Sequence, residues 1–142
     1  MLYSGTYERS LDAKKRVAVP SDWVSGEGEV FFVIPHPREG YLMVMPHREF
    51  DRWEQKIQES GATPGEKRQA IRDFYGTART VTADKQGRIL LPDAHCTAAA
   101  LKSEVVFVGS KSRFEIWAKD RFESALPANT EVFKRVADMI GL

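Results

Sequence analysis

An aspartate is followed four residues later by an arginine at two places in this chain. Asp12 precedes Arg16 and, in the second half of the chain, Asp84 precedes Arg88; three apolar residues and a proline follow each arginine. Such a carboxylate can accept backbone N–H groups of a turn and can hold the guanidinium through charge-assisted hydrogen bonds. Guanidinium donors that stay free can contact phosphates or a guanine edge in a major groove. We call residues 12–16 the first turn and residues 84–88 the second turn.

The surroundings of both turns support a binding role at least as well as a purely structural one. An Asp-Arg pair alone could simply neutralise itself and lock its turn. Residues 9–20, however, hold four cationic side chains against one carboxylate, and residues 79–92 hold three against one, whereas the whole chain has a net charge of only +1. This asymmetry concentrates positive potential at the turns. We therefore expect phosphate contacts from Lys14, Lys15 and Lys85.

The residue before each arginine differs between the turns. Gly87 suits a position with positive φ, where any other side chain costs energy. Lys15 stands at the same place in the first turn. That turn therefore either has another conformation or accepts strain in exchange for a further positive charge.

Short apolar runs must position these turns. We expect each turn to be the tip of a hairpin, because β-rich runs flank it and a proline ends the second run. Further strands are expected where longer apolar runs follow. The predicted strands are 6–10, 16–19, 30–34, 41–45, 79–82, 88–91, 105–108 and 113–117.

Helices are expected between and after the strands. Apolar spacing predicts one helix from about residue 50, and Thr63-Pro64-Gly65-Glu66 predicts a capping box that begins a second. A helix near residues 119–125 should be cut short by Pro127, with a separate amphipathic segment over 131–140. The pattern favours an α+β fold, mainly β, in which two similar segments share one core about a pseudo-twofold axis.

Several function classes lack the residues they need. Cys96 is the single cysteine, so no intramolecular disulfide can form, and the three histidines lie at no metal-ligand spacing. From that spacing we expect no metal site. We also expect no cofactor and no enzymatic activity, because neither a phosphate-binding glycine loop nor a nucleophile elbow is present. With no apolar run long enough to span a bilayer and no signal-peptide pattern, we expect a cytoplasmic protein without membrane contact.

The paired signatures, the sequence 84–92 and the run Phe114-Glu115-Ile116-Trp117 together resemble the MraZ family of the SpoVT-AbrB superfamily. The resemblance covers residues 1 to about 126. It implies a swapped-hairpin β-barrel with flanking helices. The implied organisation is a first SpoVT-AbrB-like repeat at 5–52, a helical connection at 53–76, a second repeat at 77–124 and a C-terminal helical tail at 125–142.

The resemblance also implies a function. Members of this family are sequence-specific DNA-binding regulators, normally repressors of the division and cell-wall gene cluster that includes their own gene. They bind short direct repeats in double-stranded promoter DNA as homo-oligomeric rings, which implies association with the nucleoid. Carried over by position, the DNA-facing groups are Arg16, Arg88, Lys14, Lys15 and Lys85, and the turn-orienting groups are Asp12, Asp84 and Gly87.

A different class of function stays open at this point. The Asp-Arg pairs could serve only to stabilise turns while exposed helices bind a protein partner. That alternative is an antitoxin-like or scaffolding interaction module.

Overall fold

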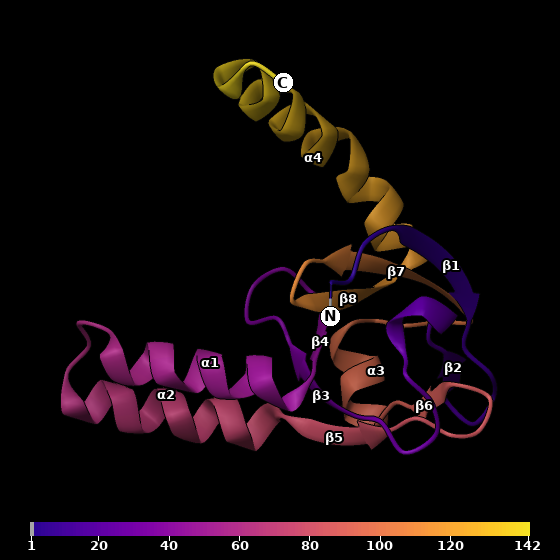
Figure 1. Cartoon of the computed structure of the whole chain (residues 1–142), viewed down its shortest axis with the longest axis horizontal. Helices are drawn as coiled ribbons and strands as arrows, with labels where there is room; N and C mark the ends of the chain where they lie inside the picture. Colours follow the sequence, from indigo (N-terminus) through magenta and orange to yellow (C-terminus); the bar gives the residue numbers. More distant parts are fainter. Residues whose placement is uncertain (1) are drawn as a thin grey trace.

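A six-stranded sheet forms the centre of the molecule (Figure 1), and the computed structural model describes residues 2–142. The strand order is β1-β7-β8-β4-β3-β5, and every neighbouring pair is antiparallel. Its strands are β1 (Thr6–Ser10), β3 (Val30–Pro35), β4 (Leu42–Met45), β5 (Arg79–Thr82), β7 (Glu104–Ser110) and β8 (Arg113–Ala118). A second sheet has two strands only, β2 (Arg16–Ala18) and β6 (Arg88–Leu90), and we call it the ribbon.

Four helices and a single 3-10 turn complete the regular secondary structure of the described residues. The fold is therefore α+β, with a core that is mainly sheet. They are η1 (Ser21–Trp23), α1 (His47–Glu59), α2 (Pro64–Thr77), α3 (Asp93–Ala98) and α4 (Lys119–Ile140). The capping box predicted for the second helix is confirmed: Thr63 accepts from the backbone of Glu66, and the Glu66 carboxylate accepts from the backbone of Thr63 at 2.8 Å.

Both faces of the central sheet are covered, because side chains alternate between its faces along each strand. On β4, Leu42 and Val44 enter one hydrophobic cluster while Met43 and Met45 enter another. The first cluster includes the inner face of the ribbon, η1 and α3. The second lies under α1, α2 and the start of α4. Trp23 is 2% exposed and packs edge-on or tilted against the rings of Tyr3, Tyr7, Phe107 and Phe114.

The strands that flank each turn do not pair as hairpins, so that prediction is wrong. β1 pairs with β7 and β5 pairs with β3, whereas β2 and β6 pair with each other. The flanking strands meet only at the turn itself, where Asp12 N–H donates to Arg16 O and Asp84 N–H donates to Arg88 O, each at 2.9 Å. We call β2 and β6, which follow the two turns, the return strands. Because they pair with each other and not with β1 and β5, each places its central apolar side chain in the shared core.

The sheet is open, and no closed barrel is found within residues 2–142. β1 and β5 are its two edges, and each pairs with a neighbour on one side only. The strands that could have extended these edges, β2 and β6, have three residues each and are used in the ribbon. The expectation of a barrel is therefore corrected to an open sheet with a separate ribbon.

The C-terminal helix is continuous where a break was expected. α4 runs from Lys119 to Ile140 with Pro127 inside it and projects away from the sheet (Figure 1). Proline removes one intrahelical hydrogen bond. Pro127 is exposed, so the carbonyl that loses its donor can be hydrated, and the helix continues. Beyond the body, α4 leaves large apolar side chains uncovered: Leu126, Val132, Phe133, Val136, Met139 and Ile140.

Candidate nucleic-acid interface

The first turn is organised around the carboxylate of Asp12. Its Oδ1 accepts the backbone N–H groups of Lys14 at 2.9 Å and Arg16 at 2.8 Å, and its Oδ2 accepts Arg16 Nε at 2.9 Å. Lys15 N–H donates to Asp12 O at 3.0 Å. One side chain thus fixes both the backbone of the turn and the base of the guanidinium.

The second turn repeats these hydrogen bonds. Asp84 Oδ1 accepts from the backbone of Gln86 and of Arg88, and Oδ2 accepts Arg88 Nε, each at 2.9 Å. One bond is added here, because Arg88 Nη2 donates to Gln86 Oε1 at 3.2 Å. Arg88 is therefore held at two points, whereas Arg16 is held by its aspartate at Nε.

Lys15 and Gly87 have the same backbone conformation. Their φ angles are 66° and 74°, both in the left-handed region. Of the two possibilities that the sequence left open, the structure has the strained one: the first turn keeps the geometry of the second and accepts a lysine where glycine is favoured.

The bonds to the turns also set the ionisation of both carboxylates. The backbone N–H of Arg16 is the largest influence that lowers the pKa of Asp12 below its ordinary value, and the Arg16 side chain adds to it. The backbone N–H of Arg88 lowers the pKa of Asp84 in the same way. Both carboxylates are therefore ionised at neutral pH, and each cancels part of the charge of its arginine. Because each carboxylate holds its arginine at Nε, the turn sets the direction of the terminal guanidinium donors.

The ribbon brings the two turns together although they lie in opposite halves of the sequence. Arg16 lies opposite Leu90, Val17 opposite Ile89 and Ala18 opposite Arg88. Leu91 N–H donates to Lys15 O at 2.9 Å, and Val19 N–H donates to Gly87 O at 3.0 Å. Each turn is thus hydrogen-bonded to the end of the other return strand. The two arginines are offset by two positions, about 7 Å along the strands.

Alternation divides the ribbon into an inner and an outer face. Val17 and Ile89 point inward and are 1% and 0% exposed. The outer face therefore carries Arg16, Ala18, Arg88 and Leu90. The arginine side chains are 35% and 32% exposed, and Leu90 is 57% exposed. Within residues 2–142, the terminal amino groups of Arg16 have no hydrogen-bond partner and can donate to a ligand.

The lysines that the sequence pointed to lie beside the arginines. Lys14 and Lys85 are exposed and Lys15 is half-buried. None of the three forms a salt bridge with a carboxylate in the part of the chain that the structure describes. Their ammonium groups can therefore contact phosphates without breaking an internal ion pair.

Leu90 is an outer-face residue that sequence reasoning missed. The sequence predicts a strand over 88–91 and does not assign its side chains to faces. Period-two alternation from Arg88 would have placed residue 90 on the arginine face. Nothing local, however, identified that face as the exposed one.

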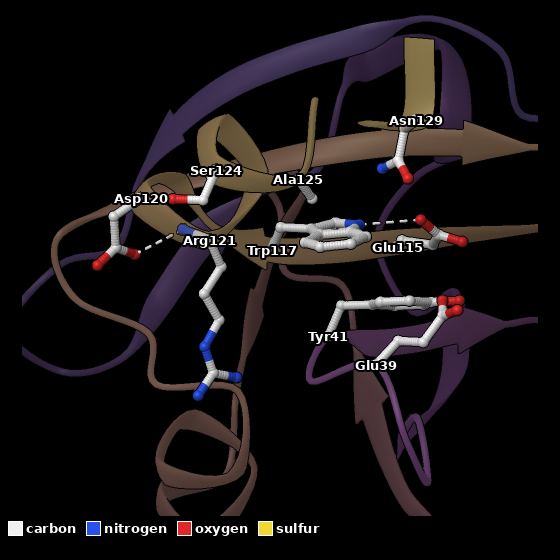
Figure 2. Close-up of a pocket in the computed structure, with 9 residues that line it drawn as sticks. All are labelled: Glu39, Tyr41, Glu115, Trp117, Asp120, Arg121, Ser124, Ala125 and Asn129. Carbon is white, nitrogen blue, oxygen red and sulfur yellow. Dashed lines mark hydrogen bonds between the residues drawn. The ribbon is translucent and has the colours of Figure 1, made fainter. Parts of the chain in front are cut away.

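An acidic hollow lies elsewhere, between β8 and the start of α4 (Figure 2). It has a volume of about 690 Å³ and contains Tyr41 and Trp117, whose rings stack on each other with centroids 4.6 Å apart. Burial raises the pKa of Tyr41, and Trp117 Nε1 donates to Glu115 Oε1 at 2.9 Å. These ring faces are occupied by each other, and the carboxylates around them repel phosphate, so this hollow does not extend the cationic surface.

Among residues 2–142, no group of three or more His, Cys, Asp or Glu side chains is arranged to hold a metal ion. No helix in that range is long and apolar enough to cross a membrane.

Comparison with known proteins connects this geometry to a family. Residues 74–141 match the family model described as "MraZ protein, putative antitoxin-like". The chain is 35% identical to the transcriptional regulator MraZ of Ligilactobacillus salivarius, over 96% of this chain and 95% of the relative. It is 39% identical to that of Lachnoclostridium phytofermentans, over 87% and 86%, and 34% identical to that of Pelotomaculum thermopropionicum, over 97% of each. The relatives are named as regulators of transcription, which is not a class of enzyme, and at these identities and lengths the chain belongs to the MraZ family.

Proposed function

We propose that this protein is a transcriptional regulator that binds double-stranded DNA in a sequence-specific manner through the outer face of the ribbon. The observation that carries the proposal is the pair of matching turns at opposite ends of one two-stranded sheet. Each turn presents an arginine whose base is fixed by an aspartate. The relatives' name gives the biological setting, which is control of transcription.

The shape and charge of the ribbon suit a major groove. A two-stranded β-ribbon fits a groove about 12 Å wide, and arginine is the residue that most often contacts guanine O6 and N7 there. Lys14, Lys15 and Lys85 flank the arginines and supply phosphate contacts, which fix position but carry no sequence information. In this arrangement Arg16 and Arg88 read bases or adjacent phosphates, while Asp12 and Asp84 orient them.

The sequence resemblance supplies the finer proposal. The protein is a repressor of the division and cell-wall gene cluster, including its own gene, and it acts at the nucleoid by binding short direct repeats in the promoter. The architecture proposed with it is a pseudo-twofold swapped hairpin with repeats at 5–52 and 77–124. Support comes from the strand order β1-β7-β8-β4-β3-β5, which maps onto itself when the strands of the two segments are exchanged.

Assembly into a ring is part of this proposal. The ribbon carries few cations and the chain has a net charge of +1. Several ribbons on one face would neutralise more phosphates, and each linked contact would raise the effective concentration of the next. The uncovered apolar side chains of α4 supply a surface for contact between copies. Phe133 and Ile140 are 67% and 71% exposed.

The test is binding of the protein to a duplex from the region upstream of its own gene, measured by fluorescence anisotropy over a range of salt concentrations. We expect Arg16→Ala and Arg88→Ala each to weaken binding by at least about tenfold and to flatten the salt dependence. Arg72→Ala is the matched control, because Arg72 lies on α2, outside the ribbon, and donates to Gln69. Unchanged binding by both ribbon variants, with circular dichroism intact, would show that the surface is wrong.

An antitoxin-like or scaffolding interaction module is the second candidate. The description of the matching family model and the uncovered apolar side of α4 favour it. The two functions differ in one measurement, which is selection from a random duplex pool. A regulator enriches one sequence, whereas an interaction module enriches none.

A further inference from the structure

Leu90 is a large apolar side chain on an otherwise cationic face. It is 57% exposed, while the residues on either side of it in the chain, Ile89 and Leu91, are 0% and 1% exposed. The inner face of the ribbon already provides the packing, so Leu90 contributes little to the core. A leucine in that place is available to a ligand.

The position of Leu90 is defined by the register of the ribbon. It lies directly opposite Arg16 and two residues beyond Arg88 on the same strand, so all three side chains share the outer face. Directly opposed residues in an antiparallel pair have Cβ atoms about 5 Å apart. Successive nucleotides of one DNA strand are about 3.4 Å apart along the axis. A side chain beside Arg16 therefore reaches the base pair next to the one that Arg16 contacts.

We infer that Leu90 is a specificity-determining residue, which contacts the C5-methyl group of a thymine adjacent to the base pair contacted by Arg16. This inference rests on the proposed DNA-binding function. The thymine methyl is the apolar feature of the major-groove edge, and apolar side chains distinguish thymine through it. The arginine and lysine donor groups recognise hydrogen-bond acceptors, so they do not respond to the methyl group.

The two ends of the ribbon then read different bases. Ala18 holds the place beside Arg88 that Leu90 holds beside Arg16. Alanine ends at Cβ, so it does not reach as far into the groove as leucine. The turns have matching hydrogen bonds, yet the apolar neighbour of each arginine differs. The ribbon therefore has a direction on DNA, with thymine preferred at one end.

The experiment replaces thymine by uracil, which removes the methyl group and keeps every hydrogen-bonding group. The duplex is the part of the region upstream of the protein's own gene that the bound protein protects from nuclease cleavage. Each thymine in it is replaced in turn. For the unaltered protein we expect one position per bound ribbon at which uracil weakens binding by about 3- to 10-fold. Leu90→Ala should bind the original duplex more weakly by a similar factor and should lose the uracil effect at that position only.

Two control variants accompany this experiment. Leu2→Ala removes another exposed leucine, 71% exposed, outside the ribbon and should leave the uracil effect unchanged. Ala18→Leu should create a second sensitive thymine at the other end of the ribbon.

The possible outcomes are separable. If the duplex binds and no thymine is sensitive, or if Leu90→Ala keeps the same sensitive position, the inference is overturned while DNA binding stands. A change in oligomeric size with Leu90→Ala and no change in uracil sensitivity would overturn it too, and would assign Leu90 to a contact between copies. Failure of the unaltered protein to bind any duplex would overturn the proposed function itself.

Discussion

Lys15 adopts the backbone conformation of Gly87, with φ of 66° against 74°, although only one of them is glycine. Both residues accept a hydrogen bond from the end of the other return strand, Lys15 O from Leu91 and Gly87 O from Val19. Equivalent bonding at both ends of the ribbon requires equivalent turns. The first turn consequently carries strain together with its extra positive charge.

Substitutions at these two positions should change the free energy of unfolding in opposite directions. Lys15→Gly relieves a left-handed residue at the cost of a more flexible unfolded chain, so we expect the free energy of unfolding to rise by about 0.5 to 1 kcal/mol. Gly87→Ala should lower it by about 1 kcal/mol. A Cβ there would stand 3.4 Å from Val24 Cγ1, an acceptable contact, so the loss would come from the backbone. Urea denaturation measures both, and a less stable Lys15→Gly variant would mean that the lysine side chain stabilises the turn.

Both turns should weaken in acid. The pKa of each aspartate is lowered in the folded state. A carboxyl with a depressed folded pKa contributes stability above its unfolded pKa, about 3.9, and that contribution is lost as the pH falls through the folded pKa. We therefore expect no change in turn stability between pH 6 and 8, and a loss that begins only below about pH 4. The measurement is thermal unfolding against pH, with Asp12→Asn/Asp84→Asn as the comparison. An identical acid profile for this double variant would mean that other carboxylates cause the transition.

Adjacent ribbon residues should differ sharply in their effect on stability. Ile89 is fully buried and Leu90 is 57% exposed. We expect Ile89→Ala to lower the free energy of unfolding by about 2 to 5 kcal/mol, because it leaves a cavity. Leu90→Ala should change it by less than about 0.5 kcal/mol. Denaturant titration of the two variants compares them directly, and equal losses would contradict the assignment of inner and outer faces.

A charge on the projecting part of α4 should disrupt assembly. Phe133→Asp places a carboxylate among uncovered apolar side chains, so we expect smaller particles in analytical ultracentrifugation. Binding to a duplex with several sites should weaken by about 100-fold, while binding to a single site should change little. Lys134→Ala is the control, since Lys134 pairs with Glu131 and is 67% exposed in its side chain. Undiminished affinity in a monomeric variant would contradict the dependence of binding on assembly.

Local features of this fold were predictable because they depend on residues a few positions apart. The β1 and β5 strands lie where the β-rich runs predicted them, and the Thr63 and Glu66 capping box forms as its spacing indicated. The spacing of Asp12 and Arg16 likewise suffices for the pair to hydrogen-bond across one turn. The continuity of α4 through Pro127 was missed, because the effect of a proline depends on whether the freed carbonyl meets solvent.

By itself the sequence determined the two turns, their cationic surroundings and most strand positions. The tertiary structure decided that β1 pairs with β7 and not with β2, that the ribbon joins turns from opposite halves of the chain, and that the sheet is open. It also decided that Leu90 shares an exposed face with Arg16. Pairing between distant strands depends on which partner buries the most apolar surface, and the face of each side chain follows from the resulting register. Neither quantity is encoded in local spacing.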